Sequence, residues 1–124
     1  MRKSVNAQNA PAAVGPYVHG VIAGDLFFAS GQLGLDKDTG ALKEGIEAQT
    51  RQSLDNVGQV LKAAGLDYEN VVKTTVFIKN MDDFALVNEI YASYFKENPP
   101  ARSCVEVARL PKDALVEIEV IAAL

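Results

Sequence analysis

The spacing of apolar residues changes repeatedly between the period of a strand and that of a helix, and this restricts the fold more than any other feature. Over residues 46–64 apolar positions recur every third or fourth residue, which predicts an amphipathic helix ended by Gly65. A second apolar stripe of this period runs from Phe84 to Tyr94, and Asn98-Pro99-Pro100 ends it. We therefore expect two helices.

The segments around these helices have the alternation or the composition of strands. β-branched residues dominate one segment between the helices, apolar residues alternate with glutamates in the last segment, and Gly24-Asp25 marks a tight hairpin near the N-terminus. The predicted strands span residues 3–5, 18–21, 26–30, 71–78, 103–108 and 115–122. The first of them is the weakest, so we expect five or six strands.

Elements in this order predict a two-layer α+β domain with both helices on one face of the sheet. The 124 residues fit one domain over 1–124, and the apolar fraction of 48% suffices for a core without disulfides or metal. The other sheet face is expected to carry Cys104 and Glu117 beside apolar residues such as Leu115 and Ile121. Because so mixed a face is poorly suited to water, we expect an oligomer of closed symmetry whose sheet faces meet.

Charge and composition argue against several classes of function. With a net charge of −4 and no run of basic residues, the chain is not expected to bind nucleic acid. No apolar stretch approaches the roughly 20 residues of a membrane span, and the N-terminus lacks the apolar run of a secretory signal. One cysteine and one histidine rule out an intrachain disulfide and leave little for a zinc site or a Ser-His-Asp triad. We expect a cytoplasmic protein.

Arg102 is the first candidate for ligand binding because it follows the stiff, extended segment Pro99-Pro100-Ala101. A guanidinium held in this way can bind a carboxylate through two parallel hydrogen bonds at little entropic cost. The commoner situation of an arginine is a surface ion pair with Asp or Glu, and this residue alone does not decide between the two. Since arginine stays protonated, its role would be to hold a substrate and not to transfer a proton.

Cys104 and Glu117 each allow a chemical and an inert interpretation. Cys104 shares a strand face with Arg102, but a thiolate nucleophile needs a base, and a lone strand cysteine is more often a small buried hydrophobe. Partial burial of Glu117 would raise its pKa and let it hold or move a proton, whereas most strand glutamates are solvated. Glu119 alternates in the same way, so periodicity does not choose between the two glutamates.

Three further positions combine polarity with an unusual context. Tyr17 lies in the turn Val14-Gly15-Pro16-Tyr17, which would hold its hydroxyl firmly, although packing is the alternative role. Ser30-Gly31 would present backbone N–H groups to an anion or form a plain bulge. Asn88 lies beside the apolar stripe of the second helix and either caps internal structure or faces a pocket. None of these residues is specific by itself.

In combination they resemble a known family. The stretch Pro100–Val105, followed by Leu110-Pro111 and Val116–Ile118, is similar to the signature of the Rid (YjgF) family of reactive intermediate deaminases. Gly15–Tyr17 and Phe28–Leu33 match the N-terminal pattern of that family. Length and element order agree as well, so the resemblance extends over essentially the whole chain.

The resemblance implies a chorismate-mutase-like fold that assembles as a homotrimer with three clefts between subunits. It also implies hydrolysis of 2-imino acids, in equilibrium with 2-enamino acids, to 2-oxo acids and ammonia without metal or cofactor. Pyridoxal-phosphate dehydratases acting on serine or threonine would supply these substrates. The alternatives are a small-carboxylate-binding module, which would not need Glu117, and a holdase or an RNA-cleaving translation inhibitor. The acidic balance of the chain argues against RNA.

The resemblance further implies the roles of individual residues. Arg102 and the backbone N–H of Gly31 would hold the substrate carboxylate, and Glu117 would orient or activate water. The pocket would be lined by Tyr17, Ser30 and Asn88. Cys104 would count among the catalytic residues mainly through its backbone and position. A protonated imine is already a strong electrophile, so oriented water in a complementary site can suffice.

Overall fold

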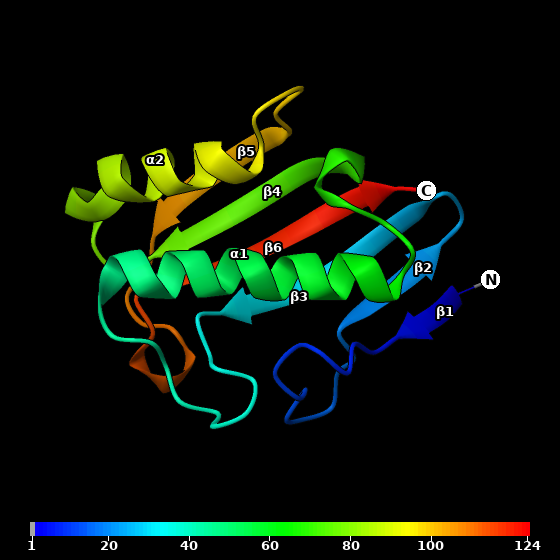
Figure 1. Cartoon of the computed structure of the whole chain (residues 1–124), viewed down its shortest axis with the longest axis horizontal. Coiled ribbons are helices and arrows are strands. Elements are labelled where there is room, and N and C mark those ends of the chain that lie inside the picture. The colour runs from blue at the N-terminus through cyan, green and yellow to red at the C-terminus, as the bar shows by residue number, and fades with distance from the viewer. Residues whose placement is uncertain (1) are drawn as a thin grey trace.

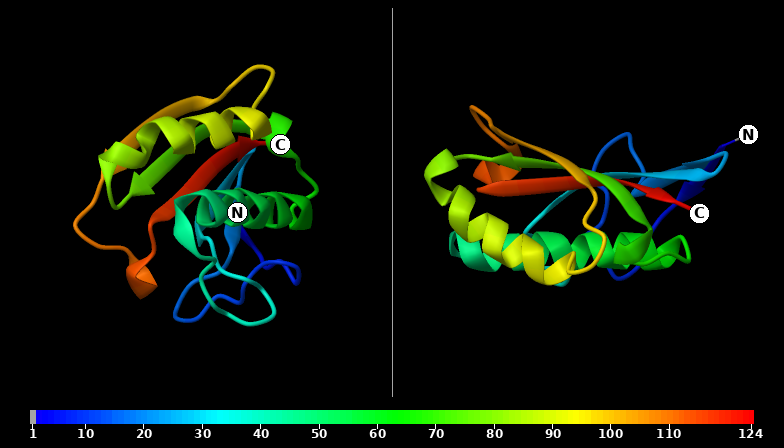
Figure 2. Two further views of the ribbon diagram at one scale, coloured as in Figure 1. Left: turned by 60° about the vertical axis from the view of Figure 1, so that its left-hand side comes forward. Right: turned by 90° about the horizontal axis from the view of Figure 1, so that it is seen from above.

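Two helices cover one face of a six-stranded mixed sheet in the computed structural model, which describes residues 2–124 (Figures 1 and 2). The strands are β1 (Arg2–Val5), β2 (Gly20–Ala23), β3 (Leu26–Leu33), β4 (Val71–Ile78), β5 (Ala101–Glu106) and β6 (Val116–Ala123), and the helices are α1 (Gly45–Ala63) and α2 (Phe84–Tyr94). The sheet order is β1-β2-β3-β6-β4-β5, and only β4 and β5 pair in parallel. The predicted two-layer α+β arrangement is confirmed.

The core lies between the sheet and the helices, where the apolar stripes of the helices pack on the buried side chains of the strands. Leu54, Val57 and Leu61 of α1 have no exposed surface, as the 3.6-residue stripe predicts. They face the alternating buried residues of the central strands, above all Val116, Ile118, Val120 and Ala122 of β6. Within residues 2–124, no helix is long and apolar enough to cross a membrane.

Connection length explains where α2 lies. Parallel neighbours such as β4 and β5 cannot be joined by a tight turn, so the chain crosses over through α2, which packs beside these two strands (Figure 1). The short helical turn η2 (Met81–Asp83) precedes α2, and Asn80 accepts the Asp82 N–H at its start. As a result, β5 forms one edge of the sheet with α2 beside it.

Three strands differ from their predicted bounds by two or three residues. β2 runs later because the Gly24-Asp25 turn joins it directly to β3. β3 continues to Leu33, since the chain pairs with β6 again after a bulge between Ala29 and Gln32. β5 begins two residues early, because the chain leaving Pro100 is already extended and Ala101 pairs with Lys73 of β4.

Cys104 lies on the helix-covered face of the sheet, so the prediction that it shares the other face with Glu117 is wrong. Its neighbour in β4 is Val76, which is 1% exposed, and Cys104 packs against the main core. Both faces of this edge strand carry apolar residues, so alternation alone did not reveal which one the helices cover. Glu117 does lie on the uncovered face, here called the open face, between Leu33 and Phe77 of the neighbouring strands.

The open face is partly apolar, as expected. Val21, Phe28 and Ile121 form a row across β2, β3 and β6, and Phe28 is 42% exposed. The segment around the short turn η3 (Pro111–Asp113) covers one end of this face, where Leu110 and Ala114 pack on Leu33. Among the described residues, no helix or further strand covers the row itself.

Gly34 marks a close approach between the end of β3 and helix α1. A Cβ at this position would lie 2.5 Å from the backbone oxygen of Gln49 and 2.6 Å from its Cα. Gly34→Ala should therefore lower the free energy of unfolding by about 3 kcal/mol through overpacking against helix backbone. Urea denaturation at fixed protein concentration, followed by circular dichroism, measures this loss.

The control is Gly40→Ala, where a Cβ meets open space and only a positive φ of +72° opposes the substitution. We expect a loss of about 1 kcal/mol from the left-handed backbone conformation. Equal losses in the two variants would contradict the contact assigned to Gly34.

Candidate functional site

Arg102 projects from the edge strand β5 onto the side chains of α2. Its Cζ lies 4.9 Å from the ring centre of Tyr91 and 5.4 Å from that of Phe84, and its Nη1 donates to Asn88 Oδ1 at 2.6 Å. Within residues 2–124, the ion pairs of the structure involve other residues, so Arg102 does not form the surface pair that was its commoner alternative. A cation without an acidic partner remains able to bind an anionic ligand.

Asn88 and Cys104 lie beside this guanidinium and complete what we call the Arg102 group (Asn88, Arg102 and Cys104). Asn88 is exposed on α2 and accepts a hydrogen bond from Arg102. Burial raises the pKa of the Cys104 thiol, an effect that the nearby Arg102 charge partly offsets. A raised pKa keeps the sulfur in its thiol form, which favours the inert interpretation of this cysteine.

His19 cannot serve as the base for that thiol, because both of its ring nitrogens are engaged elsewhere. Nδ1 accepts from the backbone N–H of Ala7 at 2.8 Å, and Nε2 bonds the carbonyl of Pro11 at 2.7 Å. The ring is 3% exposed. It therefore fixes the segment before β2 and takes no part in the Arg102 group.

Glu117, Gly31 and Tyr17 surround a second site, a pocket of about 90 Å³ that we call the Glu117 pocket. Its lining residues are Pro11, Ala12, Tyr17, His19, Gly31, Gln32, Leu33, Leu35, Pro111 and Glu117. A Cβ on Gly31 would lie 2.7 Å from Glu117 Oε2, so only glycine lets this carboxyl group rest against the bulge of β3. The bulge interpretation of Ser30-Gly31 is thus confirmed.

Two hydrogen bonds of Ser30 hold this bulge in place. Its Oγ donates to the carbonyl of Val18 at 2.7 Å, and its N–H donates to the carbonyl of His19 at 2.8 Å. A neighbouring hollow of about 350 Å³ touches both Ser30 and Tyr17, so Tyr17 lies between the two depressions. Tyr17 is 51% exposed, which contradicts its alternative role in core packing within one chain.

Burial distinguishes the two glutamates that alternation left equivalent. Glu117 is half-buried and Glu119 is exposed. Burial raises the pKa of the Glu117 carboxyl, and the charge of Glu119 raises it further. A carboxyl group with a raised pKa can hold a proton closer to neutral pH and can act as an acid or a base there.

The Arg102 group and the Glu117 pocket lie on opposite faces of the sheet. Arg102 pairs in register with the fully buried Thr74 under the helices, whereas Glu117 pairs with Phe77 on the open face. In the sheet, β4 separates β5 from β6 and β6 separates β4 from β3 (Figure 1). In a single chain the predicted site residues therefore form two separate groups, one on each face of the sheet.

Phe84 and Tyr91 are contacts of Arg102 that the sequence reasoning missed. Both belong to the apolar stripe of α2 and were interpreted only as core residues. The available signal was the position of Asn88, four residues after Phe84 and three before Tyr91, which puts all three side chains on one helix face.

Comparison with known proteins identifies the family to which the chain belongs. The family model described as endoribonuclease L-PSP matches residues 7–124. The chain is 54% identical to the 2-iminobutanoate/2-iminopropanoate deaminase of Salmonella typhimurium, an alignment that covers 98% of each protein. The chain belongs to the Rid (YjgF) family. The resemblance seen in its motifs is thereby confirmed.

Solved structures of the Rid family have the same fold. The YjgF gene product of Escherichia coli superposes with a TM-score of 0.92 at 52% identity, covering 98% of both chains. Escherichia coli TdcF, whose structure holds bound serine, superposes with a TM-score of 0.95 at 46% identity, again covering 98% of both chains. The mixed sheet and paired helices are thus shared with these Rid proteins.

Proposed function

We propose that this protein hydrolyses 2-iminobutanoate, 2-iminopropanoate and their enamine tautomers to 2-oxo acids and ammonia. The observation that carries the proposal is the Arg102 guanidinium, held on aromatic rings without an acidic partner among the described residues. Such a cation suits the carboxylate that these substrates share. The 54% identity to a curated deaminase supports the same reaction.

The complete site forms between subunits of a chorismate-mutase-like homotrimer in this proposal. Two features of the single chain support it: the separation of the Arg102 group from the Glu117 pocket, and the uncovered apolar row with Phe28. Arg102 lies on an edge strand and reaches a neighbouring subunit without passing through its own sheet. Closed threefold packing of the open faces then places one subunit's Arg102 at the Glu117 pocket of the next.

In this site Arg102 and the Gly31 N–H hold the substrate carboxylate, and Tyr17, Ser30 and Asn88 shape the pocket. The Glu117 carboxylate accepts a proton from water as the water oxygen bonds to C2 of the protonated imine, whose C=N electrons move to nitrogen. The Glu117 carboxyl then returns the proton to the amine. The C–N bond breaks, and the departing ammonia takes the hydroxyl proton and leaves as ammonium while the 2-oxo acid forms. A raised Glu117 pKa suits both steps.

Cys104 contributes position and packing, and its thiol takes no covalent step. The reaction needs no metal or cofactor, because the protonated imine is already electrophilic and the site has only to orient water. The imines that pyridoxal-phosphate dehydratases release from serine or threonine are the expected substrates. RNA is not proposed as a substrate, since the net charge of −4 opposes phosphate binding.

A coupled assay tests the proposed reaction. Excess threonine dehydratase generates 2-iminobutanoate from threonine, so that imine hydrolysis limits the appearance of 2-oxobutanoate. Adding this protein should accelerate 2-oxobutanoate formation in proportion to its concentration. If the rate equals that of spontaneous hydrolysis at every concentration, the deaminase function is wrong.

Glu117→Gln tests the proton-transfer step. The amide keeps the size of the carboxyl group but cannot accept a proton, so kcat should fall by a factor of about 10²–10³. Affinity for the product 2-oxobutanoate should change little, because Arg102 and Gly31 remain. Glu119→Gln, on the exposed neighbour of the same strand face, is the control and should keep kcat within about threefold of wild type, because burial is the larger cause of the raised Glu117 pKa. A wild-type kcat in Glu117→Gln would reduce Glu117 to a structural residue.

The same substitution has a stability readout whose sign is fixed by the raised pKa of Glu117. The folded state favours the protonated carboxyl. Glu117 therefore contributes to the free energy of unfolding below its unfolded-state pKa near 4.5, and this contribution is lost as the pH rises through its folded-state pKa. Glu117→Gln should therefore raise the urea midpoint relative to wild type more at pH 7 than at low pH. An equal effect at both pH values would contradict the burial of this carboxyl group.

A further inference from the structure

We propose that Tyr91 and Phe84 are positioning residues that hold the Arg102 guanidinium in the orientation in which it binds a carboxylate. The inference rests on the proposed function, because it takes Arg102 as the residue that grips the substrate. It goes further in assigning the specificity of that grip to two aromatic rings of α2.

The first support is the way the rings contact the guanidinium. Arg102 Cζ lies over both rings, 4.9 Å from the centre of Tyr91 and 5.4 Å from that of Phe84. An aromatic ring attracts the cation electrostatically and does not bind its N–H donors as a carboxylate does. An acidic partner would instead occupy the donors that a substrate carboxylate needs. The rings therefore stabilise the cation without taking the place of a carboxylate ligand.

Among residues 2–124, only one of the in-plane donors has a side-chain partner. Nη1 donates to Asn88 Oδ1 at 2.6 Å, and Asn88 lies between Phe84 and Tyr91 on the same helix face. This hydrogen bond restrains the guanidinium at one nitrogen, and the two rings confine its central carbon. Together the three side chains of α2 define the orientation of Arg102.

Tyr91 is itself held rigidly. Its ring is 6% exposed, lies 4.7 Å from the Phe95 ring, and its hydroxyl is 2.7 Å from Thr74 Oγ1. Thr74 is fully buried in β4 and is the neighbour of Arg102 across the β4–β5 ladder. Strand, helix and guanidinium thus form one connected unit. A long arginine side chain on an edge strand would otherwise lose considerable rotamer entropy when it binds a ligand.

Removing a ring should weaken ligand binding without changing the chemistry of bound substrate. Tyr91→Leu retains apolar volume but loses the aromatic face, so the Kd for 2-oxobutanoate should rise about tenfold, while kcat falls by less than about threefold. Tyr91→Phe keeps the ring and loses the hydroxyl, so it should bind within about twofold of wild type. A role in folding alone would not produce this difference between Kd and kcat.

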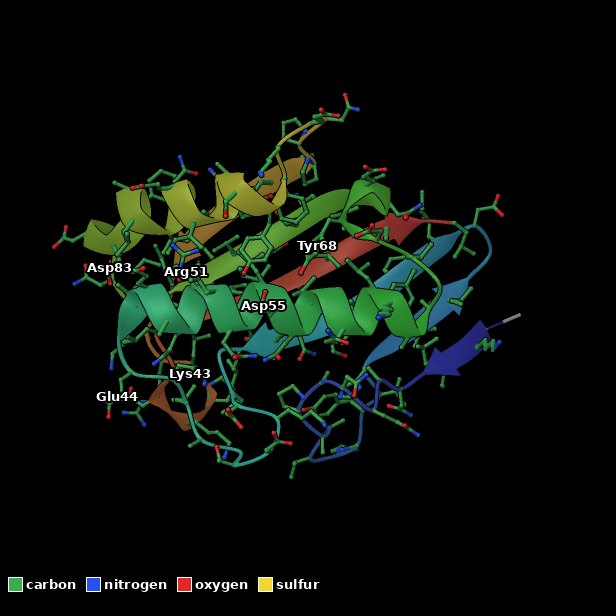
Figure 3. All side chains as sticks on the ribbon, viewed as in Figure 1. Lys43, Glu44, Arg51, Asp55, Tyr68 and Asp83 are labelled. Carbon is green, nitrogen blue, oxygen red and sulfur yellow. The ribbon has the colours of Figure 1, made fainter. Side chains whose placement is uncertain are left out.

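Isothermal titration calorimetry with 2-oxobutanoate and the coupled assay measure these values. Tyr94→Leu is the matched control, because Tyr94 lies on the same helix but in another environment. Its ring centre lies 5.5 Å from that of Tyr68, and its hydroxyl donates to Asp55, which points from α1 toward α2 (Figure 3). It should leave the Kd within about twofold of wild type, since its ring does not touch Arg102. Phe84→Leu, at a half-buried position, should raise the Kd about threefold and provides a second variant if Tyr91→Leu does not fold.

Arg102→Ala, titrated in parallel, separates the two proposals. Loss of 2-oxobutanoate binding in Arg102→Ala, with wild-type affinity in both Tyr91→Leu and Phe84→Leu, would overturn the positioning role alone. Equal losses in Tyr91→Leu and Tyr94→Leu would also overturn it, because the effect would then follow helix packing. Wild-type binding in Arg102→Ala would refute the carboxylate grip and this inference with it.

Discussion

Arg102→Ala is expected to lower kcat/KM for 2-iminobutanoate by a factor of at least about 10³, measured in the dehydratase-coupled assay. A hydrogen bond to a charged group contributes about 1.5–3 kcal/mol, and a bidentate guanidinium makes two of them to the substrate carboxylate. Alanine removes both together with the positive charge. The oligomer should survive, because Arg102 packs on the rings of α2 and makes no ion pair within residues 2–124.

Two further variants define what Arg102 supplies. Arg102→Lys keeps the charge but loses the fork of parallel donors, so it should recover only part of the activity. Arg51→Ala is the matched control: Arg51 lies on α1 in an exposed pair with Glu47 and should be dispensable (Figure 3). An Arg102→Ala variant that keeps the wild-type elution volume in gel filtration and more than a tenth of wild-type kcat/KM would show that the carboxylate is bound elsewhere.

Much of the environment of Arg102 could be predicted from the chain. Pro99 and Pro100 do stiffen the segment before it, and the extended chain enters β5 directly at Ala101. The contact with Phe84 and Tyr91 could not be predicted, because it depends on the crossover that lays α2 beside β5. Periodicity shows that a helix has an apolar face but does not show which strand that face meets.

The Glu117 pocket also depends on contacts that the spacing of residues along the chain does not reveal. Alternation placed Glu117 opposite the buried residues of β6 correctly, yet it gave Glu119 the same status. The difference arises from Gly31 and Tyr17, which approach Glu117 from β3 and from the segment before β2. Such contacts between distant parts of the chain set the pKa of a carboxyl group, and local spacing does not contain them.

The error on Cys104 has a related cause. An edge strand with apolar residues on both faces satisfies either orientation, so the sequence pattern fitted both. Arg102 shares the strand face of Cys104, so its side chain also lies on the helix-covered face of the sheet and not on the open face. The site residues, which the family resemblance places at clefts between subunits, form two groups that a single chain holds apart.

The second large effect follows from this separation: two inactive variants should restore activity to each other. If each site combines Arg102 of one subunit with Glu117 of the next, an Arg102→Ala chain still supplies an intact Glu117 pocket and a Glu117→Gln chain still supplies an intact guanidinium. The two variants are mixed in equal amounts, dissociated in denaturant and refolded together. In the proposed homotrimer, about one site in four then joins two intact halves on average. Activity should return to roughly a quarter of wild type.

A site contained within one chain predicts a different result. Each mixed oligomer would then lack one residue in every site, and no activity would return. The control mixes wild type with the double variant Arg102→Ala/Glu117→Gln, which should give about a quarter of wild-type activity for shared sites and about half for sites within a chain. Native mass spectrometry confirms that subunits have mixed in both samples. The two experiments together thus report where the boundary of the site lies.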